Sequence, residues 1–282
     1  MKYFLDTEFL EGSQKTFFGK SKPTIDLISI GIVDENGNEY YAISKDFNLK
    51  EAWNRFDLVN DNSVGVRIGC SPLKKKIYWI RENVLKPIFE QLCFKEYMSL
   101  TNKEALKFID VIKSCSNQLD FFKENFLYSM PVHYWEFNCT ILKELINRNG
   151  KSNKDIAKEV EQFCKPNETK AINAGIDAII GNLDPNTEFY GYYSDYDWVV
   201  FCWLFGKMMD LPKGFPMYCR DLKQMSDDVY NEKKKAYTLK GGNNFLLDLK
   251  KHPEYPKQYN EHNALSDAKW NLELFKFLQG VG

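Results

Sequence analysis

Acidic residues near the start of this sequence have the type and spacing of a site for a divalent cation. Asp6 and Glu8 are separated by one residue within a short apolar run. If that run is a strand, both carboxylates project from the same face and lie close enough to share one hard cation. Magnesium prefers such oxygen ligands. An Asp-x-Glu pair is also compatible with a strand end that carries ordinary solvated acids.

A second pair lies near the end of the chain, where His262 precedes a predicted helix and Asp267 lies in its first turns. Together they offer a base and a ligand that can point at one site. The alternative is that Asp267 only interacts with the positive end of the helix dipole, while His262 is a surface loop residue.

Asp197 is a further candidate, because it begins a predicted helix directly after a predicted strand. A plain structural alternative is that Asp197 does no more than cap the N-terminus of that helix. Asp195, two residues earlier, competes for any functional role. Spacing alone leaves this choice open.

Three strands are predicted at the beginning of the chain, and they would position Asp6 and Glu8. Residues 2–6 form an aromatic and apolar run, and residues 24–33 form a second run rich in β-branched residues. Asn36-Gly37 is typical of a tight hairpin turn, and residues 39–44 then read as the returning strand. We therefore expect three antiparallel strands.

Helices are predicted through the middle of the chain. Residues 47–71 carry no clean period and are expected to be irregular, whereas residues 77–92 are expected to be helical with a bend at Pro87. Residues 153–164 are expected to form a helix capped by Asn153. Another helical stripe is predicted to contain Trp135, Cys139, Leu142 and Ile146.

The last third of the sequence alternates between strand and helix patterns. Residues 188–193 are predicted to form a strand and residues 197–209 an apolar helix. A short strand and helix are expected within residues 217–224, followed by a polar loop over residues 231–244. Residues 264–278 complete the chain as a helix that presents Leu265, Ala268, Leu272 and Phe275 on one face.

Composition limits the class of protein. The 282 residues are 44% hydrophobic, which is enough for a sizeable core, and the net charge of -1 excludes a global basic field, so any nucleic-acid binding must be local. No apolar run reaches the ~18 residues that a membrane helix needs. The seven cysteines are scattered and never form a CxxC pair. We therefore expect a cytoplasmic protein with reduced thiols and no membrane segment.

Taken in order, these motifs resemble the DEDDh 3′-5′ exonucleases. The resemblance rests on Asp6-Thr7-Glu8-Phe9, the strand Leu27-Ile28-Ser29-Ile30-Gly31, Tyr196-Asp197, and His262 with Asp267 five residues later. Tyr four residues before the final Asp would mark the related DEDDy type, but Asn263 stands there. The sequence is similar in particular to the bacterial ribonuclease AS branch, through residues 79–85, 202–206, 211–212 and 220–222.

The resemblance implies an α/β fold of the ribonuclease H-like type, a mixed sheet flanked by helices, as one domain over residues 1–282 with a helical insertion at 94–150. It also implies that two Mg²⁺ or Mn²⁺ ions are held by Asp6, Glu8, Asp197 and Asp267, and that His262 is the general base. The products would be nucleoside 5′-monophosphates released from single-stranded RNA. The ribonuclease AS branch is dimeric, so a homodimer is expected.

Substrate-binding candidates also come from the matching stretches. Phe9 and Tyr196 could contact the terminal nucleotide, and so could Trp198, although a core position is an equal alternative for these rings. Arg81 and Arg220 could neutralise phosphates. The lysine runs at residues 74–76 and 233–235 are more often simply solvated faces.

Two alternatives to an exoribonuclease stay open. Recognition of a 2′-hydroxyl cannot be read from these residues, so a DNA exonuclease of the same fold is one alternative. A non-catalytic nucleic-acid-binding or scaffolding module is the other, and the presence of all four acids together with His262 argues against it.

Overall fold

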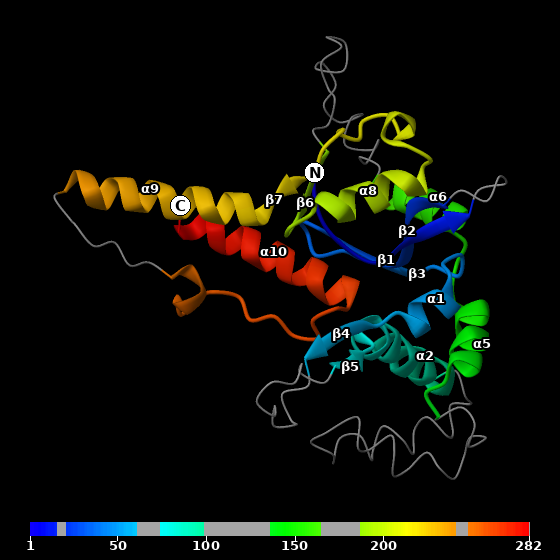
Figure 1. The fold of residues 1–282 in the computed structure, drawn as a ribbon. Helices are drawn as coiled ribbons and strands as arrows, with labels where there is room; N and C mark the ends of the chain where they lie inside the picture. The colour runs from blue at the N-terminus through cyan, green and yellow to red at the C-terminus, as the bar shows by residue number, and fades with distance from the viewer. Residues whose placement is uncertain (16–20, 61–73, 99–135, 165–186, 241–247, 282) are drawn as a thin grey trace, which may run out of the picture. The chain divides into compact units, whose positions relative to one another are not determined.

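The computed structural model describes residues 1–15, 21–60, 74–98, 136–164, 187–240 and 248–281 (Figure 1). The chain separates into two compact units. Unit 1 consists of Met1–Phe47 and Lys151–Gly282, and unit 2 consists of Asn48–Gly150. Each unit has its own set of helices and strands, and we describe them separately.

Unit 1 is built around a mixed sheet in which the described strands follow the order β3-β2-β1-β6-β7. β1 (Lys2–Lys15) pairs antiparallel with β2 (Ser21–Asp34), and β2 pairs antiparallel with β3 (Glu39–Ile43). On the other side of β1, β6 (Glu188–Gly191) runs parallel to it, and β7 (Arg220–Asp221) runs parallel to β6. The arrangement is α/β with a mixed sheet and is compatible with a ribonuclease H-like fold.

The three antiparallel strands predicted at the start of the chain are confirmed. β2 and β3 are joined by the predicted turn, in which Gly37 adopts a φ of 88° and donates its backbone N–H to the carbonyl oxygen of Asp34. That φ lies in the left-handed region, which glycine adopts without steric cost. β1 is longer than predicted, because it continues past Glu8 to Lys15 after an irregularity between Glu8 and Phe9.

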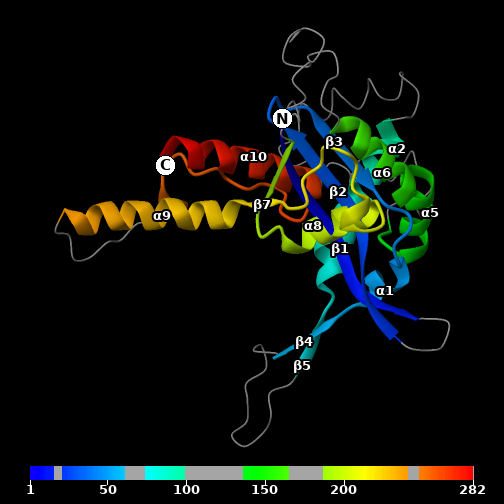
Figure 2. The ribbon, with the colours of Figure 1, turned by 90° about the horizontal axis from the view of Figure 1, so that it is seen from above.

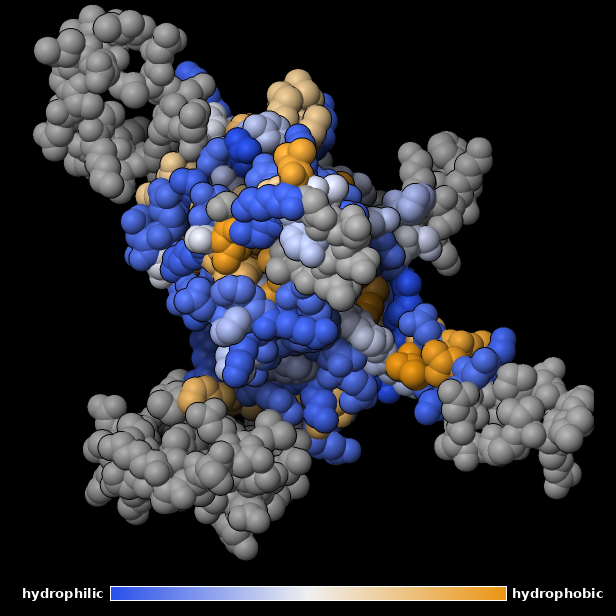
Figure 3. Space-filling view, turned by 90° about the vertical axis from the view of Figure 1, so that its left-hand side faces the viewer, coloured by the Kyte–Doolittle hydropathy of each residue, from blue (hydrophilic) through white to orange (hydrophobic). Residues whose placement is uncertain are grey.

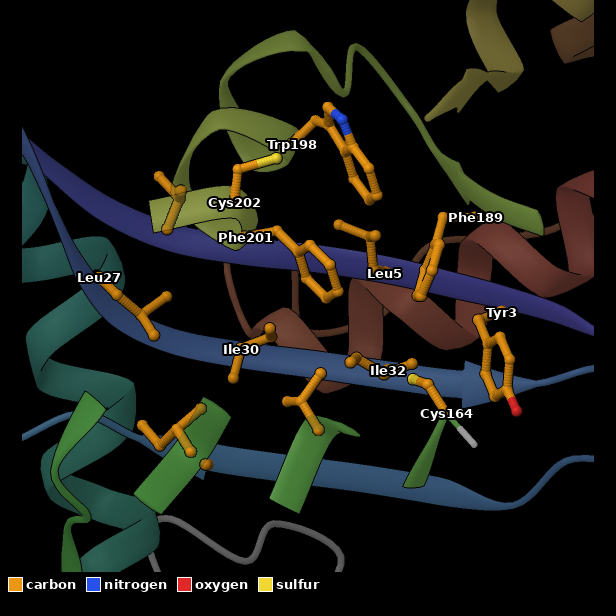
Figure 4. Packing of buried hydrophobic residues seen from close by; sticks show 14 residues of the cluster. Tyr3, Leu5, Leu27, Ile30, Ile32, Cys164, Phe189, Trp198, Phe201 and Cys202 are labelled. Atoms are coloured by element: carbon orange, nitrogen blue, oxygen red, sulfur yellow. The ribbon is translucent and has the colours of Figure 1, made fainter. Parts of the chain in front are cut away.

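One face of the sheet packs against α6 (Asn153–Phe163) and α8 (Asp195–Leu204). Successive side chains of a strand point to opposite faces, so Tyr3 and Leu5 of β1 both enter this core. Figure 4 shows Tyr3, Leu5 and Ile32 on the strands facing Phe189 and Phe201. Burial of these large apolar side chains is the main source of stability for this layer.

The opposite face of the sheet packs against α10 (Ala264–Val281). The strand residues on this face alternate in sequence with those of the first core. Phe4 lies between Tyr3 and Leu5 in sequence but contacts Tyr190 and Phe275 on this second side. α9 (Leu222–Leu239) runs beside α10, as both Figure 1 and Figure 2 show. The predicted C-terminal helix is therefore confirmed, and it covers the face to which the even-numbered residues of β1 point.

Two predicted boundaries in unit 1 are wrong. Residues 231–239 belong to α9 and not to a polar loop, because their Lys, Glu and Ala residues favour a helix even where little of it is buried. Residues 241–244 of that predicted loop lie outside the described residues. α8 ends at Leu204 and not at Met209, since Gly206 takes a φ of 111° just beyond it and stops the helix. A short 3-10 turn at Met208–Asp210 follows, and another spans Leu249–Lys251.

A smaller error concerns the cap of α6. The residue before this helix, Ser152, accepts a hydrogen bond from the backbone N–H of Asp155 at 3.1 Å, so Ser152 and not Asn153 is the N-cap. The predicted helix itself is confirmed over Asn153–Phe163.

Unit 2 contains α1 (Leu49–Asn54), α2 (Lys86–Met98) and α5 (Cys139–Asn149), together with a ribbon of two antiparallel strands, β4 (Asp57–Asn60) and β5 (Lys74–Ile77). The prediction of an irregular segment over residues 47–71 is wrong for α1 and β4, which are too short to show a clear hydrophobic period. Residues 61–71 of that segment lie outside the described residues, as do residues 99–135 of the expected insertion.

The helix predicted over residues 77–92 is present, but it begins after β5 and contains a π-helical turn at Arg81–Leu85. Pro87 follows this turn. A proline ring clashes with the carbonyl group four residues earlier, and a widened turn relieves that clash. In α5, Leu142 and Ile146 are buried as predicted, whereas Trp135 lies outside the described residues.

Five of the seven cysteines lie in the described part of the chain. Cys93, Cys139, Cys164, Cys202 and Cys219 are all free thiols. Cys70 and Cys115 lie outside the described residues. Across the described part of the chain, no helix combines the length and the apolar character that crossing a membrane requires.

Candidate active site

Asp6 and Glu8 lie on β1 in unit 1, just beyond the point where β1 and β6 stop pairing. The last matched residues of these parallel strands are Phe4 and Tyr190, and on the other side Asp6 pairs with Gly31 of β2. Asp6 and Glu8 alternate with Thr7, so they share with Phe4 the face that α10 covers. This placement follows directly from the period of the strand.

Asp197 approaches β1 from the first turn of α8. It is buried, and its Oδ1 accepts two hydrogen bonds from Thr7, one from the backbone nitrogen at 2.8 Å and one from Oγ1 at 2.6 Å. Asp195 is exposed. Of the two aspartates that the sequence left open, the structure places Asp197 beside the strand that carries Asp6 and Glu8.

Asp267 and His262 are linked by a short local hydrogen bond. The backbone nitrogen of His262 donates to Oδ2 of Asp267 at 2.8 Å, and Nε2 of Gln258 donates to Oδ1 at 2.7 Å. His262 adopts a φ of 67°, in the left-handed region, which costs a residue other than glycine about 1–3 kcal/mol. The hydrogen bond to Asp267 helps to hold this strained conformation.

His262 and Asp267 lie close to Glu8 and form one cluster with it. A ligand atom from each of Glu8, His262 and Asp267 lies within 4.8 Å of the other two. Glu8 comes from the first strand of the chain, whereas His262 and Asp267 come from the approach to α10 and its first turn. The fold therefore joins the two motifs that the sequence suggested separately.

A close approach of backbone to backbone seats the start of α10 on the sheet. A Cβ atom placed on Gly31 would lie only 2.3 Å from the carbonyl oxygen of Ala264, so this position has no room for a side chain. One turn after Asp267, Asn271 donates its side-chain amide to the carbonyl oxygen of Leu5 at 2.9 Å. Both contacts fix the distance between Asp267 and β1.

The electrostatics of the cluster are those of crowded carboxyl groups. The pKa of Asp6 is well above its usual value, first because of desolvation and then because of the negative charges of Asp197, Glu8 and Asp267. Burial, followed by the charges of Asp267 and Asp197, raises the pKa of Glu8 to about 8. Burial is the largest cause of both shifts, and repulsion by the neighbouring carboxyl groups adds to it.

Hydrogen bonds offset part of the rise in pKa at the two other acids, Asp197 and Asp267. Burial raises the pKa of Asp197 to about 6, although the bonds from Thr7 lower it. Burial likewise raises the pKa of Asp267, while Gln258 and His262 lower it. A cation bound among these groups would reverse the effect of their mutual repulsion, because positive charge favours the ionised forms.

The donor set fits magnesium or manganese. Glu8, Asp267 and His262 lie within reach of one ion, and Asp6 and Asp197 are close enough for their charges to act on the same group. Carboxylate oxygens are the hard ligands that these ions prefer. Burial and the mutual repulsion of these carboxyl groups raise the pKa of Asp6 and Glu8. Divalent cations would supply positive charge to offset this repulsion.

Among the substrate-binding candidates of unit 1, Phe9 and Tyr196 lie together. Their rings are stacked with centroids 5.9 Å apart, and Tyr196 is 53% exposed. Trp198 instead is buried, stacks on Phe201 and donates its ring N–H to the carbonyl oxygen of Met217. Those contacts give Trp198 a packing role.

The two arginine candidates already have protein partners. Arg220 forms an ion pair with Glu188 at 3.0 Å on the surface of unit 1. Arg81 belongs to unit 2, where Nε and Nη2 donate to the carbonyl oxygen of Trp53 at 2.8 and 2.6 Å.

Sequence reasoning missed several residues that support the acids. Thr7 carried a usable signal, because alternation along β1 points it away from Asp6 and Glu8 and toward the helix that carries Asp197. Gly31 was quoted only as part of a strand motif, and its role depends on contact with a helix more than two hundred residues away. Gln258 lies in an irregular segment and has no local pattern that would single it out.

Comparison with known proteins gives a short but specific match. The chain is 48% identical over 52 residues to a protein named 3′-5′ exoribonuclease in Mycobacterium tuberculosis, in strain CDC 1551 / Oshkosh and equally in strain ATCC 25618 / H37Rv. The matched stretch covers 18% of this chain and 26% of each relative. No family model matches the chain. The chain thus spans about a quarter of the length of the curated relatives it matches, which supports a relationship to exonucleases at most.

Proposed function

We propose that this chain is a metal-dependent 3′-5′ exoribonuclease of the DEDDh type. The observation that carries the proposal is the cluster of Asp6, Glu8, Asp197 and Asp267 with His262 at its edge. Crowded acids with raised pKa values are costly for a fold, and such groups concentrate at functional sites. The short match to exoribonucleases points to the same chemistry.

In this proposal the four acids hold two Mg²⁺ or Mn²⁺ ions. Such ions, when bound, activate a water molecule and offset the charge that develops on the leaving oxygen of a phosphodiester. His262 accepts the proton of the attacking water, a role suited to a side chain whose ordinary pKa is about 6.5. Asp267 has a second task, because its bond to the backbone of His262 sets the position of the imidazole.

The stacked pair of Phe9 and Tyr196 would receive the terminal nucleotide. Phe9 follows Glu8 directly, and an exposed tyrosine ring offers a surface for base stacking, worth about 1–3 kcal/mol per base. Arg220 begins β7 and would contact a phosphate only after exchanging its partner Glu188. Trp198 would act indirectly, by packing beneath the start of α8.

Hydrolysis of end-labelled single strands tests this proposal. Purified protein is incubated with RNA and with DNA of the same sequence, in Mg²⁺, in Mn²⁺ and in EDTA. We expect stepwise shortening from the 3′ end with release of nucleoside 5′-monophosphates, only with metal, and faster on RNA.

Three variants assign the activity to the cluster. Asp6→Asn and His262→Ala should each lower the rate at least a hundredfold, and Asp195→Asn, a change to the exposed neighbour of Asp197, should leave it unchanged. Degradation in EDTA, or activity that survives Asp6→Asn, would contradict the proposal. Faster hydrolysis of DNA would identify a DNA exonuclease, and strand binding without shortening would identify a binding module. The expected homodimer stays a prediction that light scattering can test.

A further inference from the structure

A row of cations and aromatic rings in mutual contact runs through unit 2. The ammonium group of Lys76 lies 4.1 Å from the centre of the Phe56 ring, and Phe56 in turn contacts Tyr78, with ring centres 5.9 Å apart. The guanidinium group of Arg81 lies 3.8 Å from the Tyr78 ring and 4.8 Å from the Trp53 ring. Five groups therefore form one continuous chain of contacts, in which two cations lie over the rings and the Phe56 and Tyr78 rings touch at a tilt.

Arg81 makes this row rigid. Its Nε and Nη2 donate to the backbone of Trp53, so the guanidinium plane is fixed between two rings. A side chain that is already ordered loses little further entropy when a ligand binds. The rings are thus held in place before any ligand arrives.

The two-stranded ribbon extends this row with exposed lysines. β5 begins with three successive lysines, Lys74, Lys75 and Lys76, all of them exposed. Within the described residues none of the three forms an ion pair with an acid. Lys76 lies opposite Leu58 of β4, whose side chain is 56% exposed. Cationic and apolar groups therefore share one surface, and Figure 3 shows orange apolar surface beside blue hydrophilic surface at the right of the view, where this ribbon lies.

Lysines on an edge strand have a simpler explanation, because they prevent one sheet from pairing with another. That explanation does not account for the apolar side chains beside them. Of the large apolar residues that are exposed in the described part of unit 2, all except Phe94 lie in or next to the ribbon: Phe56, Leu58, Ile77 and Trp79. A surface designed only to stay solvated would not gather these groups around its cations.

We propose that this surface, formed by Trp53, Phe56, Tyr78, Arg81 and the β4–β5 ribbon, binds single-stranded nucleic acid. A single strand offers a row of phosphates and a row of unpaired bases, which match lysines and aromatic rings respectively. We name it the cation–aromatic surface. It lies in unit 2, whereas the acid cluster lies in unit 1, so it is a strand-binding site in addition to the catalytic one. It complements the proposed function but does not depend on hydrolysis.

Binding is measured with a fluorescent 20-nucleotide RNA and the matching DNA, by anisotropy in EDTA, so that no strand is degraded. The test variant replaces Lys74, Lys75 and Lys76 with glutamine. The matched control replaces Lys233, Lys234 and Lys235, the other lysine triplet, in the exposed second half of α9. A third variant, Phe56→Leu, keeps an apolar side chain but removes the ring.

We expect the β5 triple variant to weaken binding at least tenfold at low salt, and the α9 triple variant to weaken it less than twofold. For single strands, the logarithm of affinity falls with the logarithm of salt by about 0.7 per phosphate contact, so the slope of the β5 variant should be shallower by about 2. Phe56→Leu should weaken binding severalfold without changing the slope, because it removes stacking and leaves the charge intact.

Equal losses in the two triple variants would show a general charge effect and would overturn the proposal. Unchanged binding in the β5 variant would overturn it as well, and would favour a protein partner or simple edge protection for this surface. A variant in which Lys74, Lys75 and Lys76 are replaced by glutamate keeps the edge strand charged and so prevents the protein from aggregating through this edge. Loss of binding in this variant cannot then be attributed to aggregation. Failure of the proposed function is distinguishable, since strand shortening by the wild-type protein is scored separately from strand binding. RNA and DNA arms that give the same affinity support backbone and base-stacking recognition without a 2′-hydroxyl contact.

Discussion

Replacement of Glu8 by glutamine should stabilise the metal-free protein at neutral and alkaline pH. Glutamine has nearly the same shape as glutamic acid but stays neutral, so it removes one of the crowded negative charges. The pKa of Glu8 is about 8 in the folded protein, against an ordinary value of 4.5. A carboxyl group whose pKa is raised by folding binds protons more tightly in the folded state. Its contribution to stability is therefore greatest at low pH and declines as the pH rises from about 4.5 to about 8.

The size of the effect follows from the shift. Each pKa unit corresponds to about 1.4 kcal/mol, so the rise at Glu8 sets an upper bound of about 5 kcal/mol on the free energy of unfolding lost by pH 8. Burial is the largest cause of this rise and repulsion by Asp267 and Asp197 adds to it, so removal of one charge relieves only part of the strain in the cluster. We expect the Glu8→Gln variant to gain about 2 kcal/mol over the wild type at pH 8 and almost nothing at pH 4.5, or roughly 5 °C in melting temperature.

Melting temperatures measured in EDTA between pH 4.5 and pH 8 provide the assay. The wild type should lose stability steadily over this range, and the Glu8→Gln curve should be flatter and cross above it. Glu232→Gln is the control, since this glutamate lies exposed in α9. Parallel curves for the wild type and Glu8→Gln would refute the reasoning, because they would mean that neither burial nor the neighbouring charges raise the pKa of Glu8 in the folded protein.

Three further outcomes follow from the same site. Thr7→Val removes the hydroxyl that donates to Asp197, and it should weaken Mg²⁺ binding measured by calorimetry about tenfold, with Thr7→Ser retaining wild-type affinity. Gly31→Ala should lower the free energy of unfolding in urea by roughly 3 kcal/mol or more, whereas Gly280→Ala in the open part of α10 should not lower it. Addition of Mg²⁺ at pH 8 should raise the melting temperature of the wild type by several degrees, and much less that of the Glu8→Gln variant.

Sequence patterns predicted the parts of the fold that depend on local signals. The Asn36-Gly37 turn, the alternation along β1 and the apolar stripe of α10 all act over a few residues, and the structure contains each of them. The end of α8 and the length of α9 were missed, because they depend on one glycine conformation and on helix propensity without burial. The sheet order joins β1 to β6 across more than 180 residues, which no local pattern records.

Some residues of the candidate site could likewise be predicted from the sequence, and others could not. Asp6, Glu8, His262 and Asp267 could be proposed from residue type and spacing. Spacing left Asp195 open beside Asp197 and the resemblance pointed to Asp197, but the hydrogen bonds that Thr7 donates to Asp197 are visible only in the structure. The support from Gln258 and Gly31 depends on the packing of α10. The stack of Arg81 between two rings was equally hidden, since Arg81 and Trp53 are 28 residues apart in sequence.

The bond from Asn271 to the backbone of Leu5 joins residues 266 positions apart, and a similar stretch of chain lies between Asp6 and Glu8 on one side and His262 and Asp267 on the other. A chain still being synthesised would carry Asp6 and Glu8 long before Asp267 and His262 exist. Its first strands could pair, yet the acid cluster would stay incomplete until α10 docked.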